Sequence, residues 1–200
     1  MNRSKLRIKT STGVMETLVN DPVDNRHGVA FIAHPHPLHG GSMDNKVVQT
    51  LAQTAYKLGM VAVRPNFRGV GQSDGLYDKG QGETEDMMDI IKFVMSHYEG
   101  LPIYLAGFSF GAYVQHRVAQ QVAHERLLLI APAVNLYEFQ PVPSSTLMIH
   151  GDKDEVVPLA DAKRFAEASG ANFSTIIGAD HFFHKKLKEL AAIVEDAWRY

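Results

Sequence analysis

The apolar residues of this chain alternate between two periods, and this alternation limits the possible folds more than any other feature. Short runs that are apolar throughout predict strands buried on both faces, and apolar positions three or four residues apart predict helices. The expected strands span 28–33, 60–65, 102–108, 126–132, 145–151 and 172–177, and the expected helices span 44–58, 83–98, 110–123, 159–169 and about 184–199. This order predicts an α/β fold with a mostly parallel, doubly wound sheet.

The start of the chain has a different pattern. Residues 6–10 and 14–19 read as two strands, and Ser11-Thr12-Gly13 between them predicts a tight turn. We therefore expect an N-terminal antiparallel hairpin before the parallel sheet. With 200 residues, 45% of them hydrophobic, and no internal repeat or linker, the sequence predicts one domain over residues 1–200.

Charge and composition narrow the possible partners. The formal net charge is −2 with charges of both signs interspersed, so there is no large basic field and nucleic acid is not an expected partner. The chain has no cysteine, which excludes disulfides, thiolate metal sites and a cysteine nucleophile. No apolar stretch resembles a signal peptide or a membrane span, so we expect a cytoplasmic protein without a membrane partner.

The segment Gly107-Phe108-Ser109-Phe110-Gly111 matches the pattern G-x-S-x-G. It stands where an expected buried strand turns into an expected helix, which is the setting of a nucleophile elbow. Glycines on both sides of Ser109 fit such a turn, because a Cβ there would clash where strand and helix come close. The position also directs the serine hydroxyl to the carboxyl ends of the strands, where α/β sheets bind ligands.

A serine hydroxyl is a weak nucleophile, so this hypothesis requires a base and an acid that orients the base. In elbow-type hydrolases they follow in the order Ser, Asp, His. The segment HGDKDEVVP (150–158) offers Asp152 and Asp154, and GADHFFH (178–184) offers His181 and His184. The pattern by itself leaves both choices open.

Five segments together resemble a known family: HPHPLHGGSMDN after the first parallel strand, NFRGVGQSDG after the next, GFSFG, HGDKDEVVP and GADHFF. The chain resembles the α/β-hydrolase superfamily along nearly its whole length, and within it the small lidless serine hydrolases of the dienelactone-hydrolase-like and carboxylesterase group. The resemblance implies that the acid stands four residues after the His of the His-Gly pair, which is Asp154, and that the base is His181. Dienelactone hydrolases use cysteine where this chain has Ser109, which disfavours that particular activity.

The resemblance further implies acyl transfer on a small-molecule substrate without a cofactor. His181 would take the proton of Ser109 as it attacks an ester or related carbonyl, Asp154 would fix the imidazole tautomer, and water would hydrolyse the acyl-enzyme. The same three residues could act on amide bonds, and a non-catalytic binding protein on a hydrolase scaffold is the remaining alternative.

The oxyanion of such a reaction needs two preorganised donors. One expected donor is the backbone N–H of Phe110, directly after the nucleophile. The other should come from the loop after strand 28–33, where Pro35 and Pro37 have no N–H. This leaves His36 or Leu38, and the position in the motif favours His36.

The histidines of that loop, His34, His36 and His39, could instead be metal ligands. No carboxylate cluster or second His-x-His lies nearby in sequence, so a rigid loop is the better interpretation and no metal is expected. His34 reads as a structural hydrogen-bonding residue at the strand end. Arg68 could meet a substrate carboxylate, although an arginine in a tight loop more often braces its surroundings.

Only about a dozen residues separate Ala131 from the next strand, so we expect no cap domain and an open, shallow site. Loop positions suggest an apolar acyl or alkyl pocket. Its expected lining residues are Leu38, Met43, Phe108, Tyr137, Phe139 and Phe182.

Overall fold

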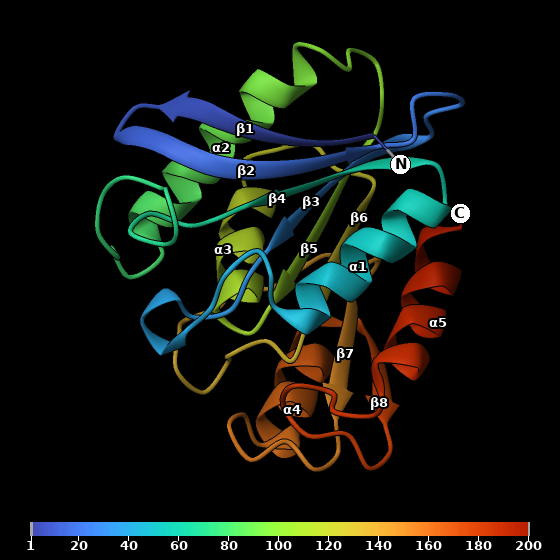
Figure 1. The fold of residues 1–200 in the computed structure, drawn as a ribbon. Helices are drawn as coiled ribbons and strands as arrows, with labels where there is room; N and C mark the ends of the chain where they lie inside the picture. Colours follow the sequence, from blue (N-terminus) through green and yellow to red (C-terminus); the bar gives the residue numbers. More distant parts are fainter. Residues whose placement is uncertain (1, 200) are drawn as a thin grey trace.

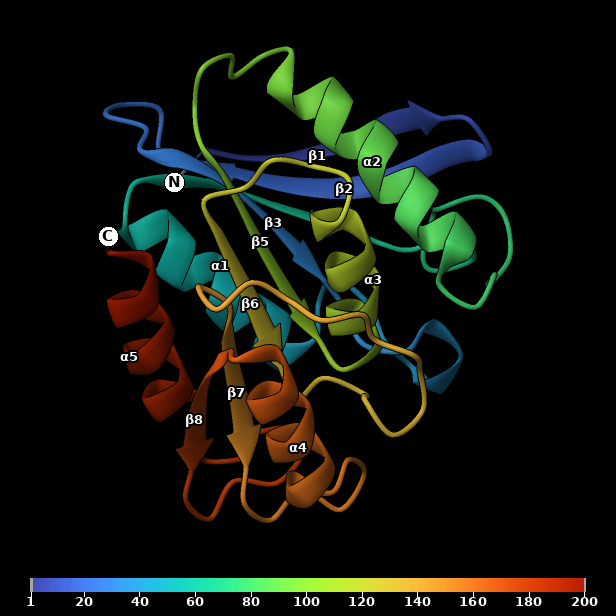
Figure 2. The same ribbon diagram turned by 180° about the vertical axis from the view of Figure 1, so that it is seen from behind.

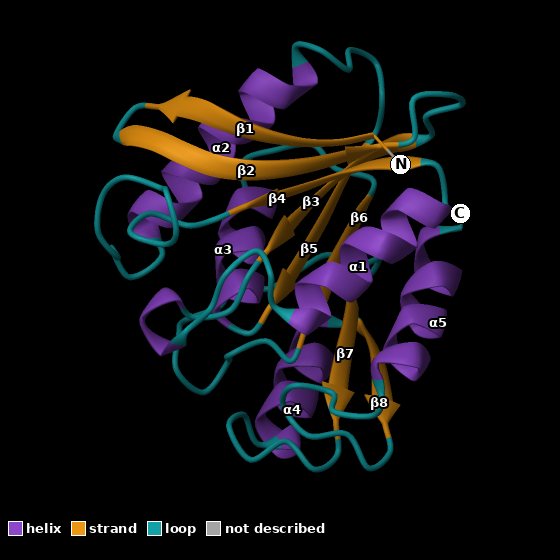
Figure 3. Ribbon diagram, in the orientation of Figure 1, coloured by secondary structure: helices purple, strands orange, loops and turns teal. Residues whose placement is uncertain are grey.

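An eight-stranded sheet runs through the protein, with helices on both of its faces (Figure 1, Figure 3). The structure is a computed structural model and describes residues 2–199. The strands are β1 (Asn2–Thr10), β2 (Gly13–Asp21), β3 (Gly28–Ala33), β4 (Met60–Pro65), β5 (Ile103–Phe108), β6 (Arg126–Ile130), β7 (Leu147–Gly151) and β8 (Asn172–Ile176). The helices are α1 (Lys46–Lys57), α2 (Gln81–Met95), α3 (Phe110–Ala119), α4 (Leu159–Ser169) and α5 (Leu187–Trp198), with a short 3₁₀ turn, η1, at Pro37–His39.

The spatial order of the strands is β1-β2-β4-β3-β5-β6-β7-β8. β1 pairs antiparallel with β2, and β2 pairs antiparallel with β4. The remaining neighbours, in the order β4, β3, β5, β6, β7 and β8, all pair in parallel. The predicted α/β fold with a mostly parallel sheet and an N-terminal antiparallel hairpin is therefore confirmed.

Two hydrophobic cores lie on the two faces of the sheet. The side chains of β3 point alternately into the one and the other. Val29 and Phe31 pack into the core shared with α2, α3 and α4, while Ala30 and Ile32 pack into the core shared with α1 and α5. This division follows from the two-residue period of a strand. Figure 2 shows the same layers from behind, with α3 and α4 in front of the sheet and α1 and α5 beyond it.

Several helix boundaries differ from the prediction: α1 spans Lys46–Lys57 instead of 44–58, and α2 spans Gln81–Met95 instead of 83–98. Two further differences have a visible backbone cause. α3 ends at Ala119 instead of residue 123, because the chain must turn before Glu125, whose N–H bonds to the carbonyl of Ile103 on β5. α5 begins at Leu187 instead of residue 184, because Phe183 and Lys185 have positive φ angles of 55° and 62° that a helix does not accommodate.

The parallel strands end at one edge of the sheet, and the loops that leave this edge carry the predicted site residues. Ser109 follows β5, Asp154 lies in the loop after β7, and His181 lies in the loop after β8. Residues 131–146, between β6 and β7, contain neither helix nor strand and so form no cap. Across residues 2–199, every helix is too short or too polar to span a lipid bilayer.

The turn from β5 into α3 brings backbones closer than any side chain would allow. A Cβ on Gly107 would overlap the carbonyl of Gly111, and a Cβ on Gly111 would overlap the carbonyl oxygens of Ala33 and His34 at the end of β3. Both obstacles are backbone atoms, one in the first turn of α3 and the other at the end of β3, and they cannot move without displacing these elements. This is the steric reason for the two glycines of the motif.

We predict that Gly111→Ala lowers the free energy of unfolding by roughly 3 kcal/mol or more, because the new methyl group overpacks the contact between α3 and β3. In an unstrained helix the same change would be favourable. Gly100→Ala is the control: its Cβ would meet open space, and only the positive φ of 78° should cost about 1 to 2 kcal/mol. Urea unfolding of both variants would contradict this account if Gly111→Ala were the milder change.

Candidate active site

Ser109 occupies a strained turn at the carboxyl end of the central strand β5. Its φ of 56° and ψ of −115° are unusual for a residue other than glycine. The backbone is held there because the Ser109 N–H donates to the carbonyl of Ile130 at 2.9 Å, while the Ala112 N–H donates to the Ser109 carbonyl at 3.0 Å. Strain of this kind persists only where the surrounding structure imposes it, and it is typical of functional sites.

The side chains of Ser109, His181 and Asp154 form one hydrogen-bonded chain. Ser109 Oγ lies 3.0 Å from His181 Nε2, and His181 Nδ1 lies 2.8 Å from Asp154 Oδ2. Because a carboxylate only accepts hydrogen bonds, His181 Nδ1 carries the proton and Nε2 is left as the acceptor for the serine hydroxyl. A serine, a neutral imidazole and a carboxylate in this order can remove the proton of the serine as it attacks.

Asp154 is held as an ionised carboxylate. Its side chain is fully buried, and burial by itself acts to raise the pKa. Hydrogen bonds from His181 and from the backbone N–H groups of Val157 and Val156, both at 2.8 Å to Oδ1, outweigh burial and hold the pKa of Asp154 below its ordinary value.

The other candidates for acid and base lie elsewhere. Asp152 Oδ1 accepts the backbone N–H of Gly178 at 2.5 Å, which ties together the loops after β7 and β8. His184 is exposed, and its Nδ1 lies 2.6 Å from Asp180 Oδ2. The expectation that His184 belongs to the last helix is wrong, since α5 begins three residues later.

His150 is a neighbour of the site that the sequence analysis used only as a landmark. Its Nε2 lies 3.0 Å from the carbonyl of Val157 and 3.3 Å from Asp154 Oδ2. Both neighbours are acceptors, so Nε2 carries the proton, and burial lowers the pKa of His150. A neutral His150 thus ties the end of β7 to the loop that holds Asp154. The contact depends on the path of this loop, which sequence spacing does not reveal.

The two residues expected to supply the oxyanion donors line the same cavity. Phe110 is the first residue of α3, so its N–H has no partner within the helix. His36 and Phe110 both line the cavity, with ring centroids 5.1 Å apart. The alternative donor, the N–H of Leu38, instead donates to His36 Nδ1 at 3.2 Å.

A cavity of about 430 Å³ opens beside Ser109 and His181. Tyr137 and Phe182 line it, as expected, whereas four other expected residues do not. The described residues that line it are Pro35, His36, His39, Gly40, Gly41, Asn45, Ser109, Phe110, Ala133, Leu136, Tyr137, Val156, His181 and Phe182.

The four expected residues that do not line the cavity are either buried in the core or located elsewhere on the surface. Phe108 is fully buried beneath His181, with ring centroids 5.1 Å apart, because residues next to Ser109 on the strand belong to the core. Met43 is also buried. Leu38 is 68% exposed on η1, and Phe139 packs against the His116 ring at 4.8 Å. The lining residues that sequence reasoning missed, such as Leu136 and Val156, lie in loops whose side-chain directions have no periodic signal.

His34 acts as a structural hydrogen-bonding residue. Its Nδ1 lies 2.7 Å from the carbonyl of Pro35, and its Nε2 accepts the backbone N–H of Phe67 at 2.9 Å. Burial lowers the pKa of His34 to about 4, so the imidazole is neutral. With both nitrogens engaged, His34 does not converge with His36 and His39, whose rings stack at 4.4 Å. Residues 2–199 contain no group of three or more His, Asp or Glu side chains arranged to hold a metal ion.

Arg68 braces the fold instead of facing the cavity. It is buried, and its Nε donates to Asp86 Oδ2 on α2 at 2.8 Å. Its Nη2 donates to the hydroxyl of Thr12 at 3.0 Å. It therefore links the N-terminal hairpin to α2, and a role toward a substrate carboxylate finds no support in its contacts.

The fold, with a serine at the sharp turn from β5 into α3, is that of an α/β hydrolase. Residues 36–145 match the family model described as "Serine aminopeptidase, S33". The chain therefore belongs to the α/β serine hydrolases, in the family that this model describes.

Relatives with known structures share the whole fold. The chain is similar to XC6422 from Xanthomonas campestris, an α/β serine hydrolase without a lid, with 33% identity, a TM-score of 0.93, and coverage of 100% of this chain and 94% of the other. It is 39% identical to an α/β serine hydrolase homologue from Coxiella burnetii, with a TM-score of 0.90 and coverage of 99% and 98%. It is also 33% identical to the uncharacterized protein RP471 of Rickettsia prowazekii, over 84% of this chain and 77% of that protein.

The neutral state of His34 predicts a specific dependence of stability on pH. Because the folded pKa of about 4 lies below the ordinary value of 6.5, the unfolded chain binds a proton between these pH values that the folded chain does not. Protonation linked to His34 should therefore lower the free energy of unfolding by about 3 kcal/mol as the pH drops from 6.5 to 4.

The measurement is urea unfolding of the wild type and of His34→Gln across this range. The variant loses the titrating group and should show a smaller loss of stability on acidification, even where it is less stable at neutral pH. Equal losses in the two proteins would show that His34 does not titrate as described.

Proposed function

We propose that this protein is a serine hydrolase that cleaves small carboxylic esters or thioesters through an acyl-enzyme. The observation that carries the proposal is the hydrogen-bonded chain from Ser109 through His181 to Asp154, at 3.0 and 2.8 Å, beside a cavity that the first two residues line. A binding protein would not need a strained serine, a base and an oriented acid in this sequence.

In the proposed reaction, Ser109 Oγ attacks the acyl carbonyl while its proton moves to His181 Nε2. The imidazolium is stabilised by Asp154, whose second oxygen is held by two backbone N–H groups and so does not rotate away. His181 then gives the proton to the departing alcohol or thiol. A water molecule, deprotonated by the same nitrogen, attacks the acyl-enzyme. His181 returns this proton to Ser109 Oγ as the acid departs, which regenerates the free serine.

The tetrahedral oxyanion would be bound by the backbone N–H groups of Phe110 and His36. Phe110 offers its N–H at the N-terminus of α3, where the helix dipole favours negative charge. His36 is preferred over Leu38 because the Leu38 N–H already donates to the His36 side chain. Removing one such donor typically costs about 3 kcal/mol of transition-state stabilisation.

The cavity supports a small, uncharged substrate. Leu136, Tyr137, Val156 and Phe182 give it apolar walls, and none of the described residues that line it is an Asp, Glu, Lys or Arg. Its volume of about 430 Å³ is within the usual range for small-molecule sites. The short connection over 131–146 leaves the cavity without a cap, which favours compact acyl and alcohol groups over long chains.

Cleavage of amide bonds is the second candidate, and the description of the matching family model as a serine aminopeptidase favours it. An aminopeptidase must recognise the α-ammonium group of its substrate, for which a buried carboxylate is the usual partner. The cavity lining contains no carboxylate, which is why we place esters and thioesters first.

The direct test is hydrolysis of p-nitrophenyl esters of increasing acyl length, with aminoacyl p-nitroanilides as the amide series. The wild type should prefer short acyl esters, and Ser109→Ala should lower kcat/KM by roughly 10⁵-fold or more, since it removes the nucleophile. Faster turnover of the anilides than of the esters would favour the peptidase, and equal rates for wild type and Ser109→Ala would contradict both.

The chain offers matched controls for the other two residues. Asp154→Asn should lower kcat by about 10⁴-fold, because the wrong imidazole tautomer is then favoured, whereas Asp152→Asn should change it little. Likewise, His181→Ala should abolish activity and His184→Ala should retain it. An equal loss in both members of a pair would argue that the loops after β7 and β8 matter only for folding.

A further inference from the structure

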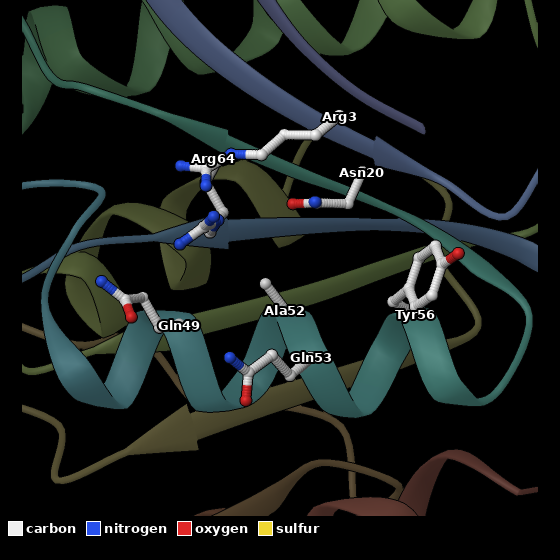
Figure 4. A pocket seen from close by; sticks show the side chains of 7 residues that line it. All are labelled: Arg3, Asn20, Gln49, Ala52, Gln53, Tyr56 and Arg64. Atoms are coloured by element: carbon white, nitrogen blue, oxygen red, sulfur yellow. The ribbon is translucent and has the colours of Figure 1, made fainter. Parts of the chain in front are cut away.

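A second cavity, of about 130 Å³, lies away from the proposed active site, between the N-terminal part of the sheet and helix α1 (Figure 4). It shares no lining residue with the cavity beside Ser109. The residues that line it are Arg3, Asn20, Gln49, Ala52, Gln53, Tyr56 and Arg64. Six of these seven side chains are polar, and the two charged ones have the same sign.

Strand register brings the polar side chains from three strands together. Arg3 on β1 is paired with Asn20 on β2, and Asn20 is paired with Ala62 on β4. Ala62 packs into the core beneath α1, so its paired residues, and Arg64 two positions further along β4, face the same side. The other lining residues of α1 follow Gln49 by three, four and seven positions and therefore share one helix face with it.

Arg64 is the buried member of this cavity. It is only 5% exposed, and its Nη1 donates to the carbonyl of Met43 at 2.9 Å. Its Nε is also buried and has no acceptor among the described residues. A guanidinium without a compensating anion is costly to bury, so this arrangement calls for an explanation beyond the packing of the fold.

The second arginine adds to the positive charge. Burial lowers the pKa of Arg64, and the nearby charge of Arg3 lowers it further, whereas Asp44 acts in the opposite direction. Asp44 does not approach closely enough to form an ion pair: within residues 2–199, neither guanidinium has a carboxylate partner within 4.0 Å. Two neighbouring like charges therefore face the cavity without a neutralising group.

The remaining side chains are suited to an oxyanion. Gln53 and Tyr56 line the cavity and carry hydrogen-bond donors, and Gln49, whose amide donates to the carbonyl of Asp44 at 2.7 Å, lines it as well. The volume equals that of roughly four water molecules, which suits a group the size of a phosphate. A donor-rich site with two arginines fits a doubly charged group with several oxygens better than a carboxylate.

We propose that this cavity is a binding site for a phosphate group, held by the guanidinium groups of Arg3 and Arg64 between strands β2 and β4 and helix α1. The group can belong to free inorganic phosphate or to a small phosphate monoester. The site is independent of the proposed hydrolase activity, since it lies outside the cavity beside Ser109.

The test is calorimetric titration of the full-length protein with inorganic phosphate, at constant ionic strength set with sodium chloride. The wild type should show saturable binding, and Arg3→Gln should weaken it about tenfold, the effect of losing one charge-assisted hydrogen bond. Arg7→Gln is the matched control. Arg7 is exposed on the same face of β1, it does not line the cavity, and its removal should change the affinity by about twofold at most.

Further arms separate the possible results. Arg64→Lys keeps the charge but loses the forked arrangement of donors, so it should also weaken phosphate binding. Circular dichroism shows whether this variant folds. If it does not fold, Arg3→Gln on the exposed edge strand still tests the site. Phenyl phosphate that binds more tightly than inorganic phosphate would identify a monoester as the ligand, and the reverse order would identify the free ion. Absence of saturable phosphate binding, equal affinity for acetate, or equal loss in Arg3→Gln and Arg7→Gln would overturn the proposal.

Discussion

The close contact between the start of α3 and the end of β3 is the constraint on which the rest of the site depends. Gly111 touches the carbonyl groups of Ala33 and His34, and this is possible only because it has no side chain. The contact forces the chain to turn sharply at Ser109, and it also brings the first N–H of α3 beside the loop that carries His36. One backbone contact thus positions both the proposed nucleophile and the two residues proposed to supply the oxyanion donors.

The proposed acid and base are positioned by a second backbone contact, between the loops that follow β7 and β8. The Lys153 N–H donates to the carbonyl of Ala179 at 2.9 Å, and Gly151 permits the approach, because a Cβ there would overlap the same carbonyl. Asp154 and His181 lie on either side of this contact. Because β8 is separated from β5 by β6 and β7, the loop after β8 must reach back along the edge of the sheet to bring His181 within 3.0 Å of Ser109.

Much of this arrangement was predictable from sequence, because buried parallel strands are continuous apolar runs and their carboxyl ends meet at one edge. The order of the elements, the turn at Ser109 and the loops of Asp154 and His181 follow from that rule. The rest depends on the paths of loops and on side-chain directions at the strand ends, which have no periodic signal. Met43 in a loop and Phe108 at the end of β5 are buried, and the loop after β7 brings Asp154 to His150. The Arg3–Arg64 cavity was not foreseen, because it needs the pairing of β2 with β4, which are not consecutive.

The central claim is that Ser109 is an activated nucleophile, and covalent labelling with a fluorophosphonate tests it most directly. Such reagents form a stable adduct with a serine whose hydroxyl can pass its proton to a neighbouring base as it attacks phosphorus. Mass spectrometry of the labelled protein and of its peptides should show one adduct per chain, located on Ser109. A protein that remains unlabelled, or an adduct on any other residue, would contradict the account.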